Sequence, residues 1–222
     1  MLGEIMHFEI LVEDISGKKV LDNLVPRLIN DNDTFRVISF KGIGHFPKNG
    51  TTGIAILTQK LLNDLPKLLV SYAKTWQTQK KEAVVIVVCD LDDKCLKQFR
   101  NELITLLNNC NPKPQTRFCI AVEEMEAWFL GDIAAIKQAY PKAKEAILKS
   151  YVHDSICGTW EKLADAVYQG GAIALNQKGW QMVGKEKSIW AENITPYFSI
   201  DNNNSPSFCY FRDSLRKIAT DL

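Results

Sequence analysis

The chain has 222 residues, 46% of them hydrophobic and 24% charged, with a formal net charge of +1. This size and composition allow a full hydrophobic core and exclude a chain that is disordered over most of its length. The near-neutral net charge gives no global field that would collect nucleic acid, so it neither supports nor excludes such a partner. The six cysteines show no C-x-x-C spacing, and we find neither a signal peptide nor a long apolar span. We therefore expect a cytoplasmic protein with reduced thiols and no membrane partner.

The first part of the chain predicts a strand, a helix and a second strand. Residues 5–12 alternate and then become apolar, which is typical of a strand, and the acids Glu13-Asp14 follow directly. Ser16 is a candidate N-cap for the amphipathic helix that comes next. Residues 34–40 predict the second strand, and the glycine- and lysine-rich residues 41–50 predict a loop.

The middle of the chain contains its strongest strand pattern. A long helix is expected from about residue 54 to residue 76, with Pro66 kinking or splitting it. Residues 84–88 are all β-branched, which favours a strand buried on both faces. The carboxylates that follow this strand are Asp90, Asp92 and Asp93.

Strands and helices alternate up to about residue 130, and only helical patterns follow. After the acids comes an amphipathic helix, and residues 116–122 predict the fourth strand. This alternation predicts right-handed crossovers and a mainly parallel four-stranded sheet flanked by helices, an α/β fold. Beyond it we expect helices at about 124–130, 132–140, 142–149, 159–168, 183–195 and 206–219. Residues 1–130 would form the α/β core, and residues 131–222 a helical cap packed on it as one structural domain.

Acids follow three of the predicted strands, and two explanations are open. The carboxyl ends of parallel strands meet at one edge, where α/β proteins bind ligands, so Glu13, Asp90 and Asp92 could converge there. Mg²⁺ or Mn²⁺ takes oxygen ligands, and Mg²⁺ needs only one or two carboxylates beside a substrate phosphate. Alternatively, each acid caps the next helix, which stabilises it by roughly 0.3–1 kcal/mol. Since a cap needs one acid per turn, we favour the site for these three residues and the cap for Asp93 and Glu124.

Two further acids after the fourth strand are candidate metal ligands. Glu123 and Glu126 share a helix face if this segment is helical, so Glu126 could extend the metal site. A charge at a helix N-terminus explains Glu126 equally well. The sequence assigns no role to Asp132.

Motifs over nearly the whole chain resemble a bacterial TOPRIM-like family of unknown function. They are Val12-Glu13-Asp14, Lys41-Gly42-Ile43-Gly44-His45-x-Pro47-Lys48, Asp90-Leu91-Asp92-Asp93, Glu123-Glu124-x-Glu126-Ala127-Trp128-x-Leu130-Gly131-Asp132 and Ser205-Pro206-Ser207-Phe208. Glu13 and Asp90-x-Asp92 are also similar to the acidic signature of TOPRIM nucleases of the overcoming-lysogenization-defect type. The resemblance implies a TOPRIM-like sheet and a metal-dependent nuclease or phosphotransferase, often paired with an ATPase in phage defence. It also implies that Glu13 acts as general acid or base while Asp90 and Asp92 hold the metal. One departure is Asp14, where TOPRIM enzymes commonly have glycine.

Five basic residues are candidate contacts to a phosphate backbone. Three lie in the loop after the second strand, namely Lys41, His45 and Lys48, and a solvated lysine loop is an equally good explanation. Lys185 and Lys187 lie at the end of a G-x-x-x-x-G-K match that lacks the final Ser or Thr, so a true P-loop is not expected. We expect the tryptophans of the helical part to build the core, namely Trp128, Trp160, Trp180 and Trp190.

Three functions follow from these patterns. The first is a Mg²⁺- or Mn²⁺-dependent nuclease acting on DNA or RNA phosphodiesters. The second is a non-catalytic or conditionally active partner subunit of an ATPase. A third, weaker one is a phosphate-binding domain such as a phosphatase or a receiver-like module.

Overall fold

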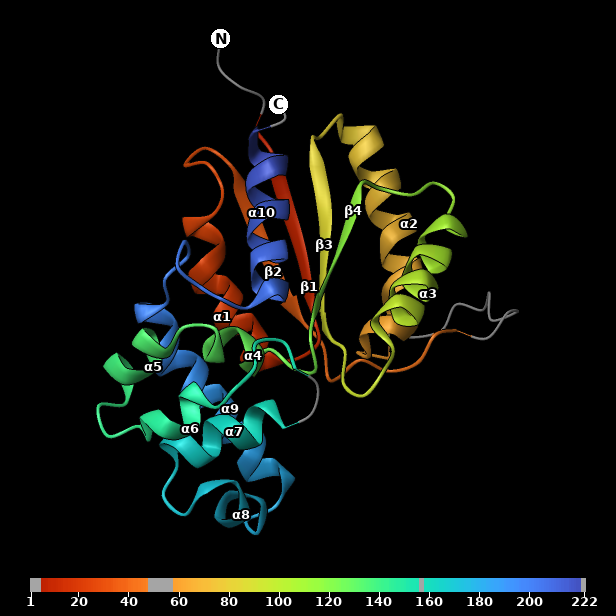
Figure 1. The fold of residues 1–222 in the computed structure, drawn as a ribbon. Coiled ribbons are helices and arrows are strands. Elements are labelled where there is room, and N and C mark those ends of the chain that lie inside the picture. Colours follow the sequence, from red (N-terminus) through yellow and green to blue (C-terminus); the bar gives the residue numbers. More distant parts are fainter. Residues whose placement is uncertain (1–4, 48–57, 156–157, 221–222) are drawn as a thin grey trace.

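A four-stranded parallel sheet forms the centre of the protein (Figure 1). The computed structural model describes residues 5–47, 58–155 and 158–220. The strands are β1 (His7–Val12), β2 (Thr34–Ser39), β3 (Ala83–Asp90) and β4 (Thr116–Ala121). Their order is β2-β1-β3-β4, and all three neighbouring pairs are parallel. The predicted α/β fold with a parallel four-stranded sheet flanked by helices is confirmed.

Helices cover both faces of the sheet, as the β-branched run in β3 predicts. Alternate side chains of a strand point to opposite faces. One face packs against α2 (Leu61–Gln79) and α3 (Leu96–Asn108), and the other against α1 (Ile15–Leu24) and α10 (Pro206–Thr220). The central strand β3 is therefore buried from Val84 to Cys89.

The remaining helices form a cap at the end of the sheet where the strands finish (Figure 1). They are α4 (Glu126–Leu130), α5 (Ile133–Ala139), α6 (Glu145–Lys149), α7 (Thr159–Val167), α8 (Gly171–Asn176) and α9 (Trp180–Ile194). Two 3-10 turns, Val25–Arg27 and Thr195–Tyr197, follow α1 and α9. One hydrophobic cluster contains residues from the sheet, α1 and the cap, so no second core begins at residue 131.

Helix α2 differs from its prediction at its start and at its proline. Residues 58–60 are not helical, because the Asp64 carboxylate accepts hydrogen bonds from the backbone N–H groups of Thr58 (2.9 Å) and Gln59 (2.8 Å) and holds a turn there. Residues 54–57 lie outside the described residues. Pro66 does not split the helix, which runs continuously through it. Its missing N–H removes one bond, to the Leu62 carbonyl, near the start of the helix.

The N-caps of α1 and α3 differ from those predicted, Ser16 and Asp93. Asp14, not Ser16, is the N-cap of α1: its Oδ1 accepts from the Gly17 N–H at 2.7 Å, and the Ser16 hydroxyl donates to its Oδ2 at 2.6 Å. The N-cap position of α3 is Cys95, so Asp93 is an exposed residue rather than a cap. In both turns several polar residues could occupy the N-cap position, and the sequence does not show which of them does.

Two further expectations for the cap helices were wrong. Helix α8 was missed, because six residues are too few to display a 3.6-residue period. Trp128 and Trp190 are fully buried as expected, but Trp180 is 80% exposed at the start of α9. None of the helices within the described ranges has the length and apolar character needed to cross a bilayer.

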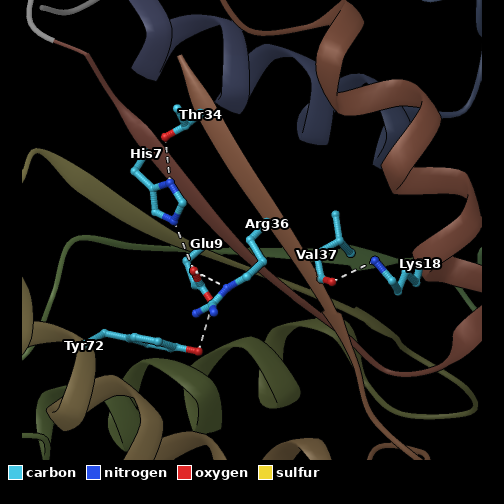
Figure 2. Close-up of polar contacts among 7 residues, drawn as sticks. All are labelled: His7, Glu9, Lys18, Thr34, Arg36, Val37 and Tyr72. Carbon is cyan, nitrogen blue, oxygen red and sulfur yellow. Dashed lines mark hydrogen bonds and ion pairs between the residues drawn. The ribbon is translucent and has the colours of Figure 1, made fainter.

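A polar cluster around the buried Glu9 joins β1, β2 and α2 (Figure 2). Glu9 is 1% exposed, and its carboxylate accepts from Arg36 Nη2 (2.6 Å) and from the Tyr72 hydroxyl (3.0 Å), and contacts His7 Nε2 (3.1 Å). Burial alone would raise the pKa of Glu9, but these hydrogen bonds outweigh it and lower the pKa. The cluster fixes α2 against the first two strands.

Candidate functional site

Glu13 and Asp90 lie next to each other at the carboxyl edge of the sheet. Val12 pairs with Val88, so these acids follow one and two residues later on neighbouring strands. The Asp90 N–H donates to Glu13 Oε2 at 3.5 Å. The parallel register therefore brings together the two acids that the sequence places after β1 and β3.

The glycine loop after β2 packs against Glu13. The Gly42 N–H donates to the Glu13 carbonyl at 3.0 Å, and the Ile43 N–H donates to the Glu13 carboxylate. Gly42 and Gly44 have φ values of +99° and +72°, and a Cβ at Gly44 would lie 2.1 Å from Asn63 Oδ1. The Gly-Ile-Gly motif is thus required for the loop to reach Glu13.

Both edge carboxyls hold their protons more tightly than usual. Burial raises the pKa of Glu13 to about 7, and the charges of Asp92 and Asp14 add to the rise. Burial also raises the pKa of Asp90 well above its ordinary value, with the neighbouring Glu13 as the next cause. No lysine, arginine or histidine of the described residues forms an ion pair with Glu13 or Asp90. A carboxyl group with a pKa near neutrality can both accept and donate a proton.

Asp92 lies near this pair but in a wetter position. Its side chain is 43% exposed and forms an ion pair with Lys94. It has a φ of +52°, and its N–H donates to the Glu123 carbonyl at 2.8 Å. This backbone contact ties the turn after β3 to the turn after β4.

Glu123 binds the N-terminus of α7 and does not point to a metal site. Its carboxylate accepts from the backbone N–H groups of Gly158 and of Thr159 (2.6 Å to Thr159), at the N-terminus of α7. Both oxygens are therefore directed to a helix end, where an anionic side chain is stabilising. We do not include Glu123 in the proposed site.

Lys187 from α9 reaches the acids that follow β4. Its Nζ lies 3.0 Å from Glu124 Oε1 and 3.2 Å from Glu126 Oε2, and its side chain is 14% exposed. Burial alone would lower the pKa of Lys187, but Glu126 and Glu124 raise it above its ordinary value. Burial raises the pKa of Glu126 to about 7, against the effect of Lys187. Lys187 is thus an ion-pair partner inside the protein, whereas Lys185 is exposed.

The helical spacing of α9 indicates that Lys187 faces the protein interior, a signal that the sequence analysis did not use. Lys187 lies three, four and seven residues before the buried Trp190, Ala191 and Ile194, on one helical stripe. This spacing predicts an inward-facing lysine, and a buried lysine needs acidic partners.

The other candidate residues lie outside the acid pair. Lys41 and His45 are exposed in the loop after β2, where the His45 N–H donates to Asn63 Oδ1 at 2.9 Å. Lys48 lies outside the described residues. Asp132 caps α5 by accepting from the Ala135 N–H at 3.0 Å, and it also accepts from the Ser199 N–H at 2.6 Å.

The edge fits a cation held by few protein ligands. Within the described ranges, no three His, Cys, Asp or Glu side chains are arranged as a ready metal site. Glu13 and Asp90 nevertheless place two carboxyl groups at this edge, and two carboxylates are sufficient for Mg²⁺ when substrate and water complete its shell. The buried Glu126 Oε2 accepts no hydrogen bond from the described residues, and its contact with Lys187 is an ion pair.

A comparison with protein-family models gives one match. The family model described as a domain of unknown function, DUF4276, matches residues 12–216. The chain belongs to this family. Neither the curated proteins nor the solved structures gave a match. The matched range of the DUF4276 domain contains the whole edge from Glu13 to Lys187, and the relation to TOPRIM nucleases stays a prediction.

We expect this DUF4276 protein to lose stability as the pH rises from about 4.5 to about 7. The folded protein raises the pKa of Glu13 from 4.5 to about 7, so it binds more protons than the unfolded chain in that range. The stabilisation is fully present below pH 4.5 and is lost as the pH passes the folded value. A shift of this size corresponds to roughly 3 kcal/mol. Thermal unfolding should show a melting temperature that falls across this range, and Glu13→Gln should reduce the slope and stabilise the protein at pH 8. An unchanged slope in Glu13→Gln would contradict the burial of this carboxyl.

Proposed function

We propose that the carboxyl edge of the sheet binds Mg²⁺ or Mn²⁺ and that the protein cleaves phosphodiester bonds of DNA or RNA. The observation that carries the proposal is the contact of the Asp90 N–H with the Glu13 carboxylate, which brings together two half-buried acids that form no ion pair with a lysine, arginine or histidine of the described residues. A bound divalent cation would offset their repulsion. The acidic motifs that resemble TOPRIM nucleases support the same reaction.

Each side chain at the edge has a role in the proposed reaction. Asp90 and Glu13 hold the cation, and the half-exposed Asp92 is close enough to contribute its charge or a water-mediated contact. The cation would neutralise charge on the phosphodiester oxygens and activate water. Glu13 would move the proton, because a carboxyl group with a pKa near 7 can both accept and donate one. Lys187 balances Glu124 and Glu126, which lowers the negative charge that an incoming phosphate meets.

A subunit that acts with an ATPase is the second candidate. It is favoured by Ile173 and Trp180, which are 75% and 80% exposed on α8 and α9 of the cap. Large exposed apolar side chains of this kind are common in protein interfaces. In that case the isolated chain would not cleave nucleic acid.

The test is cleavage of labelled single-stranded and duplex DNA and RNA by the purified full chain. Mg²⁺, Mn²⁺ and a chelator are compared at fixed protein concentration. We expect products with either metal and none with the chelator. Cleavage that persists in the chelator would contradict the metal site, and no cleavage of any substrate would favour the second candidate.

A further inference from the structure

A cavity of about 780 Å³ lies between β2 and α2. Its walls include Ile38 from β2, Phe40 just after the end of β2, and Leu68 and Tyr72 from α2. Small-molecule sites are commonly concave, mainly apolar and aromatic, and of this size. The cavity is therefore large enough and apolar enough to take a ring system.

The cavity adjoins the carboxyl edge of the sheet. Its lining includes Asp14, which follows Glu13 in the chain, and Gly42, whose N–H donates to the Glu13 carbonyl at 3.0 Å. Lys41, also in the lining, is exposed beside them. A ligand in the cavity can thus extend a phosphate toward Glu13 and Asp90.

Two polar side chains of the helix wall, Tyr72 and Asp64, are already bonded within the protein. The Tyr72 hydroxyl donates to Glu9 (Figure 2), and the Asp64 carboxylate accepts from Thr58 and Gln59. These bonds fix α2 and the turn before it in place. The cavity is therefore preformed, and a ligand meets mainly apolar and aromatic surface.

We infer that this cavity receives one nucleoside of the substrate strand, with its base between β2 and α2 and its phosphate at the carboxyl edge. The inference rests on the proposed function and deepens it, because it assigns the site that holds the nucleotide next to the cleaved bond. Phe40 and Tyr72 provide ring surface for a base, and such stacking tolerates every base. The protein should therefore bind a single nucleotide with little base preference.

Calorimetric titration of the full chain with thymidine 5′-monophosphate tests this inference, with inorganic phosphate as the second probe and Mg²⁺ present. Leu68→Trp fills the cavity, and Leu68→Met is the matched control of similar volume. We expect the nucleotide to bind at least about tenfold more tightly than phosphate, and Leu68→Trp to weaken it about tenfold. Leu68→Met should change the affinity less than about twofold. Phosphate binding should be equal in the three proteins.

Two results would overturn the inference: a nucleotide that binds no better than phosphate, or full nucleotide affinity in Leu68→Trp. If circular dichroism shows that Leu68→Trp is unfolded, Phe40→Leu removes a ring while keeping the wall apolar, and it should also weaken the nucleotide. Metal-dependent cleavage without selective nucleotide binding would leave the nuclease standing and remove the cavity site. Nucleotide binding that depends on Leu68 without any cleavage would keep the cavity site and remove the nuclease.

Discussion

Replacing Asp90 by asparagine should reduce metal-dependent cleavage by on the order of 10²–10³-fold. Asparagine keeps the shape of the side chain but removes the charge that, with Glu13, would hold the cation. The Asp90 side chain is half-buried at the end of β3, and the nearby Asp92 carboxylate is already paired with Lys94. Initial rates at saturating Mn²⁺ give the measurement.

Asp93→Asn is the matched control, because Asp93 is an exposed carboxylate three residues further along the chain. It should cleave at the wild-type rate. Glu13→Gln should lose roughly 10²–10⁴-fold, as expected for removal of a general acid or base. Equal rates in Asp90→Asn and Asp93→Asn would remove the assigned site.

Replacing Lys187 by methionine should lower the free energy of unfolding by about 3–5 kcal/mol. Methionine keeps most of the apolar stem but leaves Glu124 and Glu126 without their cation, and Glu126 is only 3% exposed. The loss is thus the cost of leaving Glu124 without its cation and of protonating the buried Glu126, whose pKa rises further without Lys187. Urea unfolding at neutral pH, followed by circular dichroism, gives the value.

Lys185→Met is the control, since Lys185 is exposed on the same helix, and it should change stability by no more than about 0.5 kcal/mol. Adding Glu126→Gln to Lys187→Met should recover part of the loss, because glutamine removes the buried carboxyl group that Lys187 no longer contacts. The same stability in Lys187→Met and Lys185→Met would contradict the buried ion pair.

The fold and the acid pair could be predicted because their signals are local. The β-branched residues of β3 identify a buried strand, and strands of a parallel sheet end at a common edge, so Glu13 and Asp90 follow from the pattern. The contact of Lys187 with Glu124 joins residues 63 positions apart, and no strand or helix period relates the two. Only the inward position of Lys187 was visible in the sequence.

The roles of Glu9 and Glu123 could not be predicted from the sequence. Glu9 alternates with apolar residues in β1 like any outward-facing polar residue, but Arg36 and Tyr72 cover it. Glu123 follows β4 as Asp90 follows β3, and it caps α7 because Thr159 comes to it from 36 residues away. Identical local patterns therefore have different roles, which depend on the tertiary partner.

Calorimetric titration of Mn²⁺ into the metal-free protein tests the central claim most directly. At pH 7 the wild-type chain should bind Mn²⁺ at one site and release protons, because the pKa of Glu13 lies near 7 and a cation at the edge favours the ionised carboxylates. Asp90→Asn should lose this binding while Asp93→Asn keeps it. Equal Mn²⁺ affinity in Asp90→Asn and the wild-type protein would contradict the assignment of the carboxyl edge as a metal site.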